Sequence, residues 1–203
     1  MRTLVIETAT EACSVALIED GACTTGEWRL MGRGHAENLV PMIAALPDRG
    51  RAGRIAVSLG PGSFTGVRVG LAAARALALA WGAETVGFPT LALLAAMARQ
   101  QAGPLPVTVA MTGGHGEWFV ESFDADGVTN GDAASLAPQA SIAATSCELV
   151  AGSQAGALVS ARGWGRALDI LPDARAFGLL PHSALSTRAQ PIYGRAPDAK
   201  VRG

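Results

Sequence analysis

The order of apolar segments in the first half of the chain limits its fold more than any other feature. Short apolar runs at Leu4–Ile6 and Ser14–Ile18, separated by a polar turn, predict two buried strands. The turn at Glu19–Gly21 then leads into a third strand that ends near Trp28. The sequence therefore predicts a sheet that opens with three antiparallel strands.

Helices and strands alternate after this opening. Apolar residues recur at helical spacing from Leu39 to Leu46, and Pro47 ends the run. The elements predicted next are a strand at Ile55–Ser58, a helix at Phe64–Trp81, a strand at Thr85–Gly87 and a helix at Leu91–Gln101. Three strands followed by helix, strand, helix and strand is the order of a ribonuclease-H-like α/β fold, in which helices flank a mixed sheet.

A second unit of related order is predicted after a linker. Gly103–Pro106 has the composition of a linker, Val107–Met111 predicts a new buried strand, and Trp118–Phe123 predicts its hairpin partner. The segment from Ala133 to Ala157 is rich in alanine and serine and shows no clear periodicity, so no elements are assigned there. We divide the chain into an N-terminal lobe, residues 1–102, and a C-terminal lobe, residues 103–203.

The composition favours a globular chain that buries part of its surface against a partner. Of the 203 residues, 49% are apolar and 16% are charged, below the roughly 25% of an average soluble domain. The net charge of −1 creates no general attraction for nucleic acid, so any RNA contact must be local. Lys200 is the one lysine, which excludes a phosphate-loop lysine or a Schiff-base lysine in the body of the fold.

Other features of the sequence predict a cytoplasmic chain with reduced, buried thiols. The segment Met1–Glu7 reaches an acidic residue too soon for a secretory leader. The most apolar later stretch, Val67–Ala83, contains two arginines, so no membrane span is predicted. The cysteines are odd in number and lack Cys-x-x-Cys spacing, which argues against a disulfide framework and a zinc ribbon. They are Cys13, Cys23 and Cys147.

The most informative motif begins at Gly60, between a buried strand and the long helix. Its glycines allow a tight turn, and the free amides at the start of the helix can bind an anion. The motif lacks the Gly-Lys-Ser/Thr ending of a nucleotide-binding loop and the Gly-x-Ser-x-Gly pattern of a nucleophile elbow. Phosphate binding and a plain strand-to-helix turn capped by Ser63 or Thr65 both stay open. The candidate residues of this motif loop are Gly60, Pro61, Gly62, Ser63, Phe64, Thr65 and Arg68.

Small residues recur every four positions along the predicted helix, at Gly66, Gly70, Ala74 and Ala78. A glycine inside a helix costs about 1 kcal/mol relative to alanine, so the close approach of another element should compensate. This small-residue ridge is either a docking face for another helix or a face that packs against the chain's own first helix or sheet.

Two further groups could bind a metal or take part in acid–base chemistry. His35 has no second histidine at metallopeptidase spacing, so we expect it to be a structural residue at a helix start, beside Glu37. Glu7 and Glu11 could form a carboxylate pair for magnesium or for proton transfer. Separate carboxylates that stay solvated at a strand end and in a turn are the more common arrangement.

Three segments carry a specific resemblance to a known family: Ile6–Leu17, His35–Pro41 and Gly60–Gly70. Together with the tail Pro191–Asp198, they are similar to the bacterial TsaB (YeaZ) family of tRNA threonylcarbamoyladenosine synthesis. The resemblance therefore extends over the whole chain. It implies the actin-like, Hsp70-like and sugar-kinase-like fold, which has two ribonuclease-H-like lobes.

The resemblance also implies a non-catalytic role. Members of this family pair with a catalytic paralogue, TsaD, which transfers a threonylcarbamoyl group to N6 of adenosine 37 in tRNAs that read codons starting with A. The ATPase TsaE joins the pair. We therefore expect no cofactor on this chain, ATP and metal on the partner subunits, tRNA contact through the complex, and a homodimer as an alternative assembly.

In the family, helices of the N-terminal lobe form the heterodimer bundle. The residues that this assigns to partner binding are His35, Leu39, Met42, Ile43, Gly66, Val69, Gly70, Ala73, Ala74 and Leu77. On this interpretation, Gly70→Leu should leave the chain folded and abolish pairing. The rival functions are a metal-dependent, glycoprotease-like peptidase and a kinase-like enzyme that binds ATP.

Overall fold

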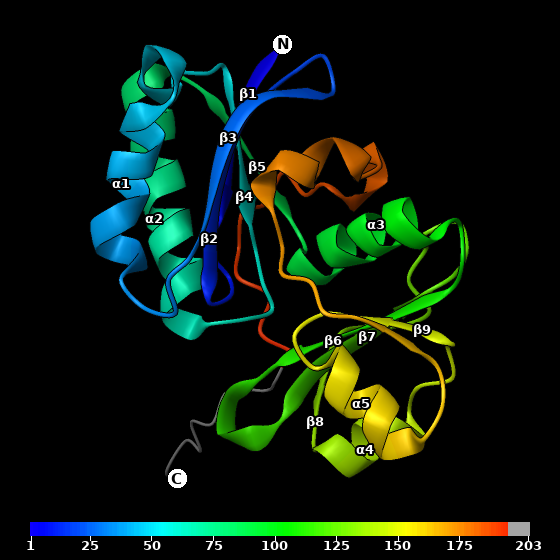
Figure 1. Cartoon of the computed structure of the whole chain (residues 1–203). Helices are drawn as coiled ribbons and strands as arrows, with labels where there is room; N and C mark the ends of the chain where they lie inside the picture. The colour runs from blue at the N-terminus through cyan, green and yellow to red at the C-terminus, as the bar shows by residue number, and fades with distance from the viewer. Residues whose placement is uncertain (195–203) are drawn as a thin grey trace, which may run out of the picture.

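The structure, a computed structural model, describes residues 1–194, and these form two lobes that are each built on a five-stranded mixed sheet (Figure 1). The strands of the first sheet are β1 (Arg2–Glu7), β2 (Ala12–Glu19), β3 (Ala22–Leu30), β4 (Arg54–Ser58) and β5 (Glu84–Phe88). Their order is β3-β2-β1-β4-β5, with β1 antiparallel to β2 and parallel to β4. The ribonuclease-H-like order predicted from the sequence is confirmed.

Both faces of the first sheet are covered, which explains why β1 and β2 are apolar almost throughout. Helices α1 (His35–Ala45) and α2 (Phe64–Trp81) lie on one face (Figure 1), where they pack on side chains such as Leu4 and Ile6. Helix α3 (Thr90–Ala102) and the 3-10 segment η3 (Ala174–Leu179) cover the other face, on which Val5 lies. The side chains of β1 therefore alternate between two apolar layers.

The second sheet repeats the topology of the first. Its strands are β6 (Val107–Thr112), β7 (Trp118–Phe123), β8 (Ala134–Leu136), β9 (Leu149–Ala151) and β10 (Arg166–Leu168). They lie in the order β10-β9-β6-β7-β8, with β6 antiparallel to β7 and parallel to β9. Helices α4 (Pro138–Ala143) and α5 (Ala155–Arg162) follow β8 and β9. The predicted second unit is therefore present, and the segment that gave no prediction contains β8, α4, β9 and the start of α5.

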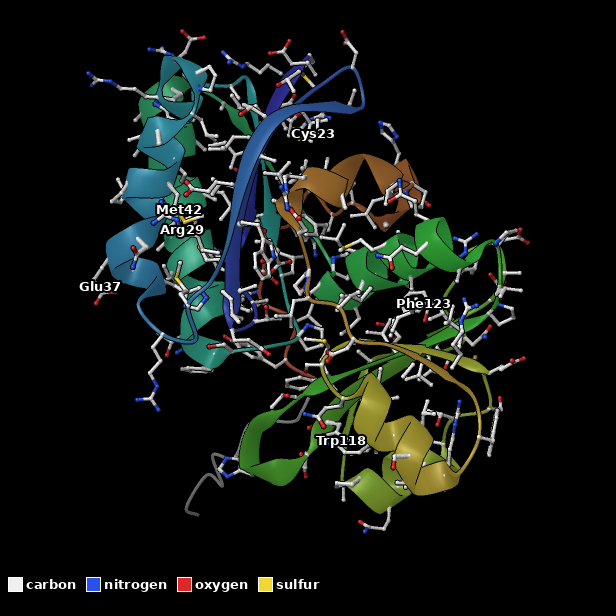
Figure 2. The ribbon with its side chains drawn as sticks, in the orientation of Figure 1. Cys23, Arg29, Glu37, Met42, Trp118 and Phe123 are labelled. Carbon is white, nitrogen blue, oxygen red and sulfur yellow. The ribbon has the colours of Figure 1, made fainter. Side chains whose placement is uncertain are left out.

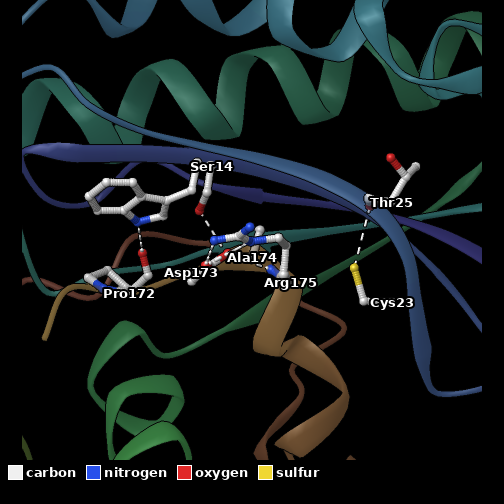
Figure 3. A network of polar contacts seen from close by, with 8 residues as sticks. Ser14, Cys23, Thr25, Pro172, Asp173, Ala174 and Arg175 are labelled. Carbon is white, nitrogen blue, oxygen red and sulfur yellow. Dashed lines mark hydrogen bonds and ion pairs between the residues drawn. The ribbon is translucent and has the colours of Figure 1, made fainter.

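The chain after β10 returns to the first lobe and closes the second face of its sheet. The indole Nε1 of Trp28 donates to the carbonyl of Pro172 (3.2 Å), and the amide of Ala174 donates to Ser14 Oγ (2.9 Å; Figure 3). Ala174 is fully buried. All strands of the first sheet precede residue 103 and all strands of the second follow it, but residues 172–194 belong spatially to the first lobe as well. The half of the family-like tail from Arg195 onward lies outside the described residues.

The three cysteines are free thiols, as predicted, but they differ in burial. Cys13 is buried on β2, and burial raises the pKa of its thiol to about 12. Cys23 is exposed near the β2–β3 turn, and Cys147 is half-buried. The prediction of burial was thus wrong for Cys23, because a strand residue beside a hairpin turn at the sheet edge has little to cover it.

Candidate functional site

A cleft of about 580 Å³ lies between the two lobes. The first lobe lines it with the turn after β1, with the loop that begins at Pro61 and with the start of α2, while the second lobe contributes β6, the β6–β7 turn and residues of β7 and β8. The polar side chains around it include Glu11, Ser63, Arg68 and His115. Tyr193 also lines the cleft, so the tail forms part of its wall.

The motif loop is held against the turn that follows β1. A Cβ atom at Gly62 would overlap the carbonyl oxygen of Ala9, and one at Gly66 would overlap the carbonyl oxygen of Thr8. The glycines are therefore required by backbone packing within the lobe. Ser63 donates its amide to Ala9 O (2.6 Å) and caps α2 by accepting a hydrogen bond from the amide of Gly66 (3.2 Å).

These contacts confirm a strand-to-helix turn capped by Ser63. Gly60 and Pro61 are buried, whereas Thr65 is exposed and does not cap the helix. Phe64 and Arg68 are exposed at the start of α2, where both line the cleft, with the Arg68 guanidinium 3.4 Å above the Phe64 ring. The amides of Ser63 and Gly66 bond within the protein, so these two are not available to an anion.

The small-residue ridge of α2 faces the chain's own sheet. Gly66, Gly70 and Ala74 are buried, and a Cβ atom at Gly70 would overlap Thr8 Oγ1 and lie 3.5 Å from Val57 Cγ2. Of the two alternatives open from the sequence, packing within the lobe is correct. The assignment of these three residues to a docking face is wrong, because β1 and β4 already occupy the space beside them.

The other predicted partner residues are also turned inward. On α1, His35, Leu39, Met42 and Ile43 are all buried, and Figure 2 shows Met42 directed toward the body of the lobe while Glu37 points outward. The remaining three are only half-buried and pack against the same core cluster. They are Val69, Ala73 and Leu77. The two helices were correctly singled out, but the faces assigned to docking were the core-facing ones.

The opposite sides of α1 and α2 carry small side chains, apolar side chains and two arginines in solvent, and we call them the outer helix face. Leu79 is 89% exposed, and the alanines of this face leave the helix backbone accessible. Its members are Ala36, Val40, Pro41 and Ala44 on α1, and Phe64, Arg68, Ala72, Arg75, Ala76 and Leu79 on α2. By length and composition alone α2 could cross a membrane, the single such helix among residues 1–194, but a core helix passes the same test.

Glu7 at the end of β1 is sealed beneath the cleft. Its carboxylate is fully buried and accepts hydrogen bonds from the amide of Ala9 (2.6 Å) and the hydroxyl of Thr90 (3.3 Å). Burial outweighs these donors and raises the pKa of Glu7 from about 4.5 to about 7. Glu11 lines the cleft and Glu7 does not, so the proposed carboxylate pair does not face a common ligand.

His35 has a structural role at the start of α1. Its Nε2 lies 3.2 Å from the carbonyl oxygen of Ala12, which ties the helix to β2. The partner is therefore a backbone carbonyl rather than Glu37. Within residues 1–194, no three histidine, cysteine or acidic side chains come close enough together to hold a metal ion.

Comparison with known proteins gives the family. A family model described as TsaD, tRNA N6-adenosine threonylcarbamoyltransferase, matches residues 29–144, more than half of the chain. The tRNA threonylcarbamoyladenosine biosynthesis protein TsaB of Escherichia coli K12 is 37% identical over 139 residues, which are 65% of this chain and 60% of that protein. YeaZ from Pseudomonas aeruginosa has a similar structure, with a TM-score of 0.77, 29% identity, and coverage of 95% of this chain and 99% of that one. The chain belongs to the family that this model describes, and within it the chain is similar to the TsaB (YeaZ) proteins.

The TsaB resemblance stated from the sequence is thereby confirmed, together with the actin-like fold of two ribonuclease-H-like lobes. The TsaB protein of Haemophilus influenzae is 41% identical over 101 residues, 47% of this chain and 41% of that protein. The chain thus aligns with about half the length of these two TsaB relatives. Both relatives are named for threonylcarbamoyladenosine biosynthesis, while the family model is named for the transferase itself.

Proposed function

We propose that this chain is a non-catalytic subunit for the synthesis of threonylcarbamoyladenosine at adenosine 37 of tRNA, where it binds and activates a TsaD-type paralogue. The observation that carries the proposal is the outer helix face, an exposed apolar surface on the helices that the family resemblance assigns to pairing. Its alanines allow a partner helix to approach closely, as helix packing through small residues requires. Exposed apolar side chains gathered on one face are typical of a protein–protein interface.

The position of Glu7 supports a role without catalysis. An acidic residue that acts on a ligand must reach the ligand, and Glu7 is closed off from the cleft by its own turn. Its carboxylate instead joins the end of β1 to Thr90 at the start of α3. Its contacts are those of a structural residue.

The further expectations belong to the same proposal. The chain acts in the cytoplasm, ATP and metal are bound by the partner subunits, the ATPase TsaE joins the heterodimer, and tRNA is contacted through the complex. A homodimer through the same outer helix face forms when the paralogue is absent. Each of these assignments follows from the family resemblance and is compatible with a chain whose apolar surface lies on α1 and α2.

Ala76→Glu tests the docking assignment. Ala76 is exposed on α2, so glutamate should leave the fold intact while its bulk and charge hold a partner helix away. We expect binding to the purified TsaD paralogue, measured by calorimetry, to weaken at least 30-fold. Ala157→Glu, on the exposed side of α5 in the second lobe, is the matched control. Its affinity for the paralogue should be within twofold of that of the unmodified chain. Equal affinities for both variants would exclude the outer helix face as the docking site.

A further inference from the structure

The last described segment, Ala189–Gly194, runs beside α2 and crosses from the first lobe to the second. Its side chains Ala189 and Ile192 pack against the core cluster under α1 and α2. Three hydrogen bonds hold its backbone, each to a different part of the chain: Arg75 Nη2 to Ala189 O at 2.8 Å, Ile192 N to Leu59 O at 2.7 Å, and Ser135 N to Gly194 O at 3.0 Å. This tail segment is therefore fixed in place on both lobes.

Tyr193 is the side chain that this arrangement brings to α2. Its ring lies 6.1 Å from the Phe64 ring, centroid to centroid, and Arg68 Nη2 donates to its hydroxyl (3.2 Å). The Arg68 guanidinium also stacks on Phe64. We call these three residues the anchor cluster. Despite their mutual contacts, Phe64 stays 58% exposed and Tyr193 51% exposed.

The anchor cluster is continuous with the outer helix face, because Phe64 and Arg68 belong to both. Tyrosine and arginine are the residue types that most often dominate binding energy at interfaces, and stacking has already ordered these three side chains. A partner that covers them would lose little additional side-chain freedom.

The charge of this surface indicates what kind of partner fits. Helix α2 contains Arg68 and Arg75 and no acidic residue. Within residues 1–194, neither arginine forms an ion pair with a carboxylate. A segment with apolar side chains flanked by carboxylates would match both the exposed rings and the unpaired positive charge.

We propose that Phe64, Arg68 and Tyr193 form the anchor for an acidic, apolar segment of the paralogue, so that the C-terminal tail is part of the docking surface. This inference rests on the proposed function, because the paralogue is the occupant to which it commits. It adds that docking on α2 involves a segment that also bridges the two lobes. None of the sequence-derived partner residues lies in the tail.

Tyr193→Ala is the first test, with Trp164→Ala as its control. Trp164 is an exposed ring on the second lobe that also stacks with an arginine, Arg162 (3.7 Å), so it matches the chemistry at a distant place. We expect Tyr193→Ala to weaken binding to the paralogue at least tenfold and Trp164→Ala to change it less than twofold. The affinity of Tyr193→Phe, which keeps the ring, should stay within threefold of that of the unmodified chain. Circular dichroism should show that every variant is folded.

Charge reversal tests the acidic character of the partner. Arg68→Glu should bind more weakly than Arg68→Ala at low salt, and the difference should shrink at high salt because screening removes the repulsion. Equal affinities of the two variants at low salt would contradict an acidic partner segment.

The remaining outcomes separate the anchor from the proposed function. Suppose that the unmodified chain binds the paralogue and that the affinities of Tyr193→Ala and Phe64→Ala are both within twofold of that of the unmodified chain. The anchor is then overturned and the proposed function stands. If the unmodified chain does not bind the paralogue, the proposed function fails and the anchor fails with it. If Tyr193→Ala changes self-association in sedimentation while paralogue binding is unchanged, the occupant is a second copy and the proposal is wrong.

Discussion

Gly70→Leu is expected to lower the free energy of unfolding by about 3 kcal/mol or more, because the new side chain has no space beneath α2. A Cβ atom at this position already overlaps Thr8 Oγ1 and approaches Val57 and Ile6. The hydroxyl of Thr8 donates to the carbonyl of Gly66 (2.8 Å), so displacing it also breaks a buried hydrogen bond that ties α2 to β1. Urea denaturation followed by circular dichroism measures the effect.

This expectation replaces the one drawn from the sequence, in which Gly70→Leu left a folded chain that could not pair. Ala72→Leu is the matched control, because it adds a leucine to the exposed side of the same helix two positions away. Its free energy of unfolding should lie within about 0.5 kcal/mol of that of the unmodified chain. If Gly70→Leu unfolds at the same urea concentration as Ala72→Leu, the Gly70 side of α2 does not pack on the first sheet.

Glu7 should make the stability of the protein fall as the pH rises from about 4.5 to about 7. Its pKa is about 7 in the folded chain and about 4.5 when exposed, so in this interval the folded state binds more protons than the unfolded state. The stabilising contribution is complete below pH 4.5, decreases through the interval and is lost above pH 7. A difference of this size corresponds to about 3 kcal/mol.

Glu7→Gln isolates this contribution, because glutamine has nearly the same shape and does not titrate. The unfolding free energy of the unmodified chain should drop by about 2.5 kcal/mol more than that of Glu7→Gln between pH 5 and pH 8. Cys13, the titratable group that interacts with Glu7, remains a neutral thiol throughout because its pKa is about 12. If the unfolding free energies of the two proteins change equally with pH, the pKa of Glu7 is not raised in the folded chain.

Much of the fold could be predicted from residue order alone, because the long elements carry strong periodicity. The helix predicted at Phe64–Trp81 has those bounds in the structure. The predicted succession of strands and helices also matches the ribonuclease-H-like first sheet. The segment from Ala133 to Ala157 gave no prediction. Its elements are three to eight residues long, too short for a helical or strand period to emerge from alanine and serine.

The helices of the candidate site were predicted correctly, but the face of each helix that is open to a partner was not. A four-residue spacing of small side chains marks one stripe of a helix, and the same stripe serves equally well against a neighbouring helix or against the helix's own sheet. Only the position of Thr8 beside Gly66 and Gly70 decides between them. The contact between Tyr193 and Phe64 could not be predicted either, since it joins residues far apart in the chain and depends on how the tail crosses the lobes.

Reconstituted tRNA modification shows whether this chain acts through a TsaD paralogue. Threonylcarbamoyladenosine is measured on tRNA incubated with the paralogue, TsaE and the threonylcarbamoyl donor, with the unmodified chain, with Ala76→Glu or with neither. Modification should depend on the chain and should be lost with Ala76→Glu. Equal modification with and without the chain, together with ATP binding by the isolated chain in calorimetry, would contradict it and favour the kinase-like alternative.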